Sequence, residues 1–83
     1  MMKREETKKF CENVLEIFNN DPYTFKKISE IIASLRLRYS FRQWEEKEVL
    51  QMISLLVKEN KVEKMYIQDL DAGKGEVRYR KKP

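Results

Sequence analysis

Polar side chains able to bind a nucleic acid recur along one stretch of the chain at the spacing of a helix face. Apolar residues three and four positions apart predict an amphipathic helix over residues about 41–60. Nearly opposite the apolar face lies a polar stripe without an acid, formed by Gln43, Lys47, Gln51, Ser54 and Lys58. Lysine neutralises phosphates, and glutamine pairs with the edge of adenine in the major groove. The stripe fits either a nucleic-acid contact or an ordinary solvated face.

The start of this helix is predicted by several neighbouring residues. Ser40 and Gln43 have the spacing of a capping box, in which each side chain bonds a backbone amide near the first turn. Tyr39 and Trp44 have the spacing of a hydrophobic staple. Three glutamates within residues 45–48 suit the positive end of the helix dipole. Because these acids point to different sides of a helix, we interpret them as dipole-stabilising rather than metal-binding.

Basic side chains are concentrated in the second half of the chain. The formal net charge is +4. Residues 1–35 carry six basic and six acidic side chains, whereas residues 36–83 carry twelve basic against eight acidic ones. Two segments of the second half are almost purely basic, one before the predicted helix 41–60 and one at the C-terminus. Two separated basic patches suit a polyanionic partner better than a diffuse excess does.

Several function classes find no support in the composition. The chain has no histidine and a single cysteine, Cys11, so a structural zinc site and an internal disulfide are not expected. We expect no enzyme, metal or cofactor, because neither a nucleophile–base pair nor a glycine-rich phosphate loop is present. Cys11 is expected to be a small core residue. No membrane span or signal peptide is predicted, and an unpaired cysteine fits a reducing, cytoplasmic location.

Two helices are predicted before the polar stripe. The first covers residues about 4–19, and the second covers about 24–36, each with apolar side chains on one face. Only a short turn is expected between the second helix and Ser40. Two helices joined in this way form a helix-turn-helix.

The start of the second helix is open between two readings. Asp21 can cap it with Pro22 at the first helical position. Alternatively, residues 23–25 form a short extended piece and the helix begins near Lys26.

The C-terminal part changes from helical to alternating periodicity. Residues 62–68 are rich in β-branched and aromatic side chains, and residues 76–82 alternate between apolar and basic ones. Residues 69–75 contain both glycines of the chain and predict the connecting turn. The whole chain, residues 1–83, is therefore expected to form one α+β, mainly helical domain of three helices and a two-stranded β-hairpin.

This layout resembles the winged helix-turn-helix superfamily. The resemblance covers nearly the whole chain and is most specific over NKVEKMYIQDLDAGKGEVRYR, which looks like a recognition-helix end followed by a wing. In that superfamily the helix after the turn usually enters the major groove, and the wing contacts the DNA backbone or the minor groove. Carried over by position, the resemblance implies nine DNA-binding residues: Arg36, Arg38, Arg42, Gln43, Lys47, Gln51, Lys74, Arg78 and Arg80.

The expected function is sequence-specific binding of double-stranded DNA by a small transcriptional regulator. The small size of the chain and its apolar first helix favour a homodimer. The alternative is a winged-helix module that binds other proteins, with Trp44 and Leu55 as anchors near the outward side of the long helix. RNA binding is a third possibility, raised by the aromatic residues near Tyr39.

Overall fold

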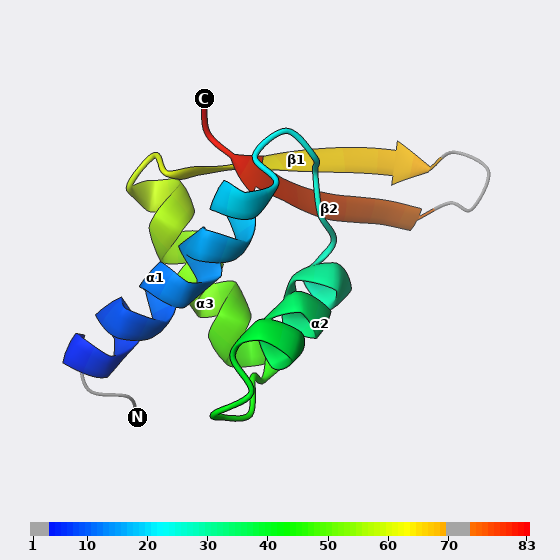
Figure 1. The fold of residues 1–83 in the computed structure, drawn as a ribbon. Coiled ribbons are helices and arrows are strands. Elements are labelled where there is room, and N and C mark those ends of the chain that lie inside the picture. Colours follow the sequence, from blue (N-terminus) through cyan, green and yellow to red (C-terminus); the bar gives the residue numbers. More distant parts are fainter. Residues whose placement is uncertain (1–3, 70–73) are drawn as a thin grey trace.

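The computed structural model contains three helices followed by an antiparallel β-hairpin (Figure 1). It describes the backbone of residues 4–69 and 74–83 and the side chains of residues 7–68 and 75–83. The elements in chain order are α1 (Arg4–Asn20), α2 (Ile28–Arg38), α3 (Glu46–Lys58), β1 (Val62–Asp69) and β2 (Lys74–Lys81). The predicted α+β, mainly helical class is confirmed, and most of the predicted connecting turn lies outside the described residues.

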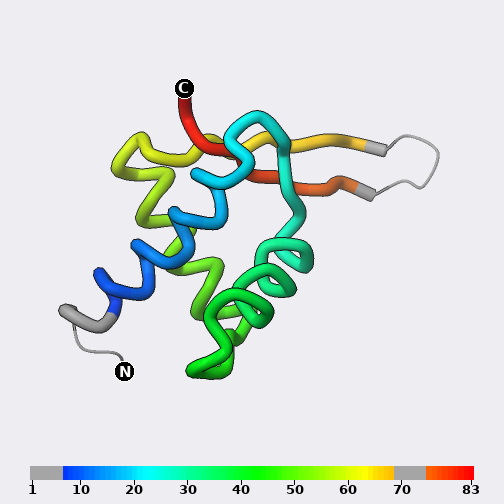
Figure 2. Tube along the Cα trace, in the orientation of Figure 1, coloured from blue at the N-terminus to red at the C-terminus, as the bar shows by residue number. Residues whose placement is uncertain are grey.

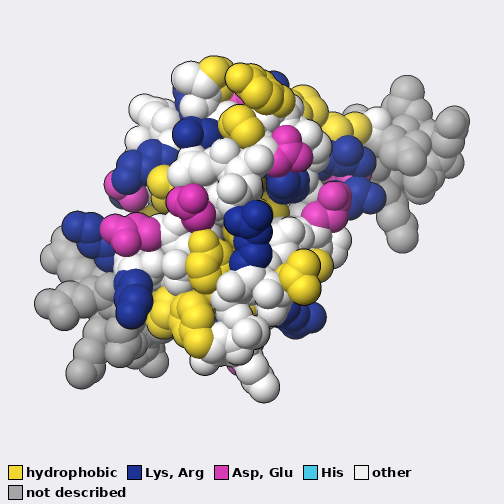
Figure 3. Space-filling view, viewed as in Figure 1, with side chains coloured by type: hydrophobic (Ala, Val, Ile, Leu, Met, Phe, Trp, Pro, Cys, Tyr) yellow, Lys and Arg dark blue, Asp and Glu magenta, His cyan; other side chains and the backbone are white. Residues whose placement is uncertain are grey.

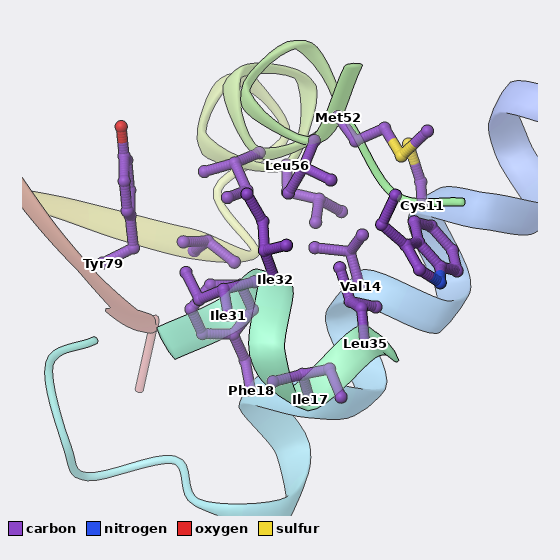
Figure 4. Packing of buried hydrophobic residues seen from close by; sticks show 14 residues of the cluster. Cys11, Val14, Ile17, Phe18, Ile31, Ile32, Leu35, Met52, Leu56 and Tyr79 are labelled. Atoms are coloured by element: carbon purple, nitrogen blue, oxygen red, sulfur yellow. The ribbon is translucent and has the colours of Figure 1, made fainter. Parts of the chain in front are cut away.

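One core lies where the three helices meet (Figure 4). α1 packs against α3, and α2 packs against both. Each helix contributes the apolar face that its spacing predicts, and Cys11 is a buried member of the core, as expected. The largest fully buried side chains are Val14, Phe18, Ile31, Leu35, Trp44, Val49, Met52, Ile53 and Val62.

The hairpin is attached to the helices at its base and extends away from them (Figure 2). Val62 and Tyr79, at the base, are buried in the core. Burial raises the pKa of the Tyr79 phenol. Lys26 pairs with Tyr79 through two backbone hydrogen bonds of 2.8 and 2.9 Å, which fixes the segment before α2 to the edge of β2. The orientation of the hairpin is therefore set by contacts with α2's leading segment and with the core.

The expected start of α3 is wrong. The helix begins at Glu46 rather than near residue 41, and the side chain of its N-cap residue, Glu45, makes no capping hydrogen bond. Ser40 lies in a turn, so the predicted capping box does not form. Instead, the buried indole of Trp44 donates a hydrogen bond of 2.8 Å to the carbonyl oxygen of Tyr39. Residues 39–45 thus form an anchored connector, longer than the expected turn.

The boundaries of α2 also differ from the prediction. The helix begins at Ile28, because Lys26 pairs with Tyr79 of β2 and Lys27 has an extended backbone, so the reading with a cap at Asp21 is excluded. The backbone N–H of Lys27 donates to the Glu30 carboxylate at 3.3 Å. The helix continues to Arg38, two residues beyond its predicted end.

α3 ends in a defined C-terminal cap that turns the chain into β1. Asn60 has a positive φ of 61°, a conformation that asparagine tolerates better than most residues. The N–H of Asn60 bonds to the carbonyl of Val57 at 3.0 Å, and the N–H of Lys61 bonds to that of Leu56 at 2.9 Å. This pair of bonds is a Schellman motif, which orders the connection between helix and hairpin.

Candidate nucleic-acid interface

The outward face of α3 carries the polar stripe that the sequence predicts. Lys47, Gln51, Ser54 and Lys58 are all exposed and line a shallow hollow on the helix surface. The opposite face is buried in the core. Gln43, although exposed, lies in the connector before α3 rather than in the helix. We call the four helical residues the α3 stripe; it presents two ammonium groups and two neutral hydrogen-bonding groups, with no acid among them.

The glutamates at the start of α3 lie beside the stripe. Glu46 is exposed on one flank. Glu48, on the other flank, is half-buried and forms an ion pair of 2.8 Å with Arg42. Because Arg42 balances the Glu48 carboxylate, the negative charge nearest the stripe on that side is compensated.

Arg42 occupies a different place from the one expected of a DNA-contacting residue. Its guanidinium lies over the ring of Phe10 at 4.3 Å and over the ring of Trp44 at 4.8 Å. Its Nε also donates to the carbonyl oxygen of Gln43 at 2.9 Å. With the Glu48 ion pair, these contacts fix the guanidinium against the fold. The structure therefore brings Arg42 to the connector and α1, not to the α3 stripe.

Arg36 and Arg38 lie in the last turn of α2 and are both exposed. Neither forms an ion pair with the part of the chain that the structure describes. Leu37, between the two arginines, is 86% exposed, and Phe41, in the connector, is 61% exposed. The apolar periodicity of the sequence did not identify either exposed side chain. The end of α2 and the connector thus present two free guanidinium groups beside exposed apolar side chains.

The two arginines of the hairpin are paired with acids. Arg78 bonds to Glu76 at 3.0 Å, and Arg80 bonds to Glu63 on the neighbouring strand. The guanidinium of Arg80 also lies 4.4 Å from the ring centre of Phe25. Both arginines share the hairpin face opposite Tyr79, as the alternating pattern predicts. The Lys74 side chain lies outside the described part of the chain.

Lys27 extends the acid–base network of the hairpin to the segment before α2. Its ammonium group lies 3.0 Å from a carboxylate oxygen of Glu76, which also binds Arg78. The hydrogen bond from Lys27, aided by Arg78 and partly opposed by burial, holds the pKa of the Glu76 carboxyl below its usual range. On the face drawn in Figure 3, Lys and Arg atoms accordingly lie among Asp and Glu atoms, with no continuous basic area.

Of the two expected protein-binding anchors, only Leu55 is exposed. Leu55 is 43% exposed, whereas Trp44 is 1% exposed, so the expected outward position of Trp44 is wrong. α3 begins after Trp44, and the connector turns the indole inward, where it packs edge-to-face on Phe10. Phe41 is the exposed member of this aromatic cluster.

Tyr66 is a surface residue that the sequence reasoning missed. It is 64% exposed, and its ring covers Gly75 on the opposite strand, where an added Cβ would lie 1.6 Å from the phenol oxygen. Tyr66 shares the hairpin face of Val77, opposite the arginines. Its spacing from Val62, which places both on one face of β1, was the available signal, although exposure could not be read from it.

Comparisons with known proteins leave the chain without an assigned family. No family model, no curated protein and no solved structure matches it. Among the residues that the structure describes, no group of acids and cysteine is arranged to hold a metal ion. Within the same residues, no helix is both long and apolar enough to cross a membrane.

Proposed function

We propose that this protein is a sequence-specific DNA-binding protein of the winged-helix type, acting as a small transcriptional regulator. α3 would lie in the major groove, and the exposed arginines of α2, with the half-buried arginines of the hairpin, would contact the backbone. The observation that carries the proposal is the α3 stripe, whose cationic and amide groups are exposed on one helix face without an acid among them. The buried, unpaired Cys11 supports a reducing, cytoplasmic location.

The contacts of the candidate residues support different roles in binding. Lys47, in the first turn of α3, and Gln51, one turn later, are exposed on its outward face, where base edges would lie in a groove. Arg36 and Arg38 form no ion pair with described residues, so they are available to phosphates without breaking an internal bond. Arg78, in contrast, must share its guanidinium with Glu76 or leave it.

A salt titration of binding to random duplex DNA tests the proposal. A protein that neutralises phosphates loses affinity as salt rises, with a slope of about 0.9 per phosphate contact in a double-logarithmic plot. We expect affinity for duplex DNA that falls steeply with salt. The absence of salt-sensitive duplex binding at about 50 mM salt would refute the proposal.

Lys47→Ala and Lys9→Ala make a matched pair for the same titration. Each removes one charge from an exposed lysine on a helix, but Lys9 lies on α1, away from the stripe. Lys47→Ala is expected to cost about 1–3 kcal/mol on a preferred site and to relax base preference at one position. Lys9→Ala should change neither quantity beyond its effect on net charge. Equal losses for the two variants would mean that α3 does not read the DNA.

A further inference from the structure

A groove of about 420 Å³ separates α1 from the C-terminal half of α3. Leu15 and the buried Leu56 contribute apolar surface to it, and Cys11 lies within its lining. Among the described residues, no other segment of the chain lines the groove besides these two helices and the Schellman turn that follows α3. The groove thus has a mainly apolar surface between two helices, with charged residues also in its lining.

Leu55 forms the ridge along one side of this groove. It is 43% exposed and lines both the groove and the shallow hollow of the α3 stripe. The helix therefore has two surfaces separated by a leucine: the stripe, which contains Lys47 and Lys58 but no acid, and the α1–α3 groove. An exposed leucine next to an apolar hollow of the same molecule can serve as both projection and receptor in a symmetric contact.

The charges at the rim of the groove are balanced. Lys8 and Glu12 lie on the α1 side, and Glu59 and Lys61 lie on the α3 side, 3.5 Å apart from each other. The chain as a whole carries +4, so two copies experience a net electrostatic repulsion. A rim with equal numbers of basic and acidic groups avoids that repulsion. It is complementary to itself rather than to a strongly charged partner.

We propose that the α1–α3 groove binds a second copy of this chain across a two-fold axis. Leu55 of each copy enters the groove of the other, so that the same patch serves both subunits. With the two α1 helices antiparallel, Lys8 of one copy faces Glu12 of the other, and the converse pair forms at the same time. This inference does not depend on DNA binding, because the groove and the α3 stripe lie on opposite sides of Leu55.

Sedimentation of the full chain without DNA tests the dimer. The wild-type protein should sediment at twice the chain mass of 10.1 kDa at micromolar concentration. Leu55→Glu buries a charge in the contact and should give a monomer, whereas Leu37→Glu, at an exposed leucine on α2, should remain a dimer. A monomeric wild-type protein, or a dimeric Leu55→Glu variant, would overturn the inference.

A charge exchange gives a second test that does not rely on Leu55. Glu12→Lys places lysines opposite each other and should weaken dimerisation at least tenfold. Adding Lys8→Glu to the same chain restores opposite charges across the axis and should recover most of the lost affinity. Circular dichroism confirms that each variant is folded. A double variant that dimerises no better than Glu12→Lys would show that α1 does not meet α1 in this way.

Discussion

Arg42 holds the connector between α2 and α3 against α1. Its guanidinium contacts two aromatic rings and a carboxylate, and it also bonds a backbone carbonyl. A planar guanidinium can stack and form an ion pair at once, whereas the compact ammonium group of lysine cannot reproduce both contacts. The position of the first turn of α3 therefore depends on an arginine that does not itself need to touch DNA.

Substitution of Arg42 should accordingly reduce stability. Arg42→Ala is expected to lower the free energy of unfolding by about 1–3 kcal/mol, because the contacts with both rings and with the half-buried Glu48 are lost together. Arg42→Lys should recover only part of this loss. Urea denaturation measures both variants, with Arg38→Ala as the control at an exposed arginine. If Arg42→Ala and Arg38→Ala have the same stability, the stacking of Arg42 has no energetic role.

Sequence patterns identified exposed polar residues better than they identified the partners of charged ones. The α3 stripe followed from periodicity, because helical spacing alone places Lys47 and Gln51 on one face. The role of Arg42 could not be predicted in this way. It depends on Phe10, more than thirty residues earlier in the chain, and on a connector that brings the two together. Long-range contacts of this kind leave no periodic signal in the sequence.

At the scale of elements, the types of helix and strand were predictable and the helix starts were not. The apolar spacing of α3 was sufficient to predict the helix, but Ser40 and Gln43 also fitted a capping box that does not form. Burial of Trp44 competes with that box, since the indole packs in the core and bonds to the Tyr39 carbonyl from a non-helical connector that ends at Glu45. Tertiary packing therefore overrides a local capping preference, and α3 begins later than the local pattern indicates.

The hairpin is joined to the segment before α2 by a carboxylate whose charge should make stability depend on pH. The pKa of Glu76 is lower in the folded protein than its ordinary value, chiefly because Lys27 donates a hydrogen bond to it. The stabilisation is therefore present above the ordinary pKa of glutamate and is lost as the pH falls through the lower, folded pKa. Acid should weaken the attachment of the hairpin by removing this charge.

Glu76→Gln tests this attachment. The denaturation midpoint of the wild-type protein should fall between about pH 7 and about pH 3, and the variant should show a smaller fall, because it lacks the titrating carboxyl. Glu45→Gln is the control, since Glu45 is an exposed acid outside the hairpin network. A pH dependence that is the same in Glu76→Gln and in the wild-type protein would contradict the proposed role of this carboxylate.

At the scale of the whole molecule, one helix would serve two partners. The outward face of α3 is proposed for DNA, and the side next to α1 is proposed for a second copy of the chain. Because Leu55 lies between them, dimerisation would fix the separation and orientation of two α3 helices. A two-fold protein of this kind recognises two inverted half-sites, and their spacing follows from the distance between its reading helices.

Selection of binding sites from random duplexes tests the two proposals together. Wild-type protein should select inverted repeats whose half-site centres lie about one helical turn, or a multiple of it, apart on the DNA. Leu55→Glu leaves Lys47 and Gln51 in place, so it should select the same half-site but no fixed spacing. On an isolated half-site Leu55→Glu should bind modestly more weakly than the wild-type protein, because its carboxylate lies beside the α3 stripe. On the repeat the advantage of the wild-type protein should be much larger, because its second contact is intramolecular. If the wild-type protein is a dimer but selects a single half-site rather than an inverted repeat, the dimer does not determine how the protein recognises DNA. Loss of half-site preference in Leu55→Glu would instead place Leu55 in the DNA contact.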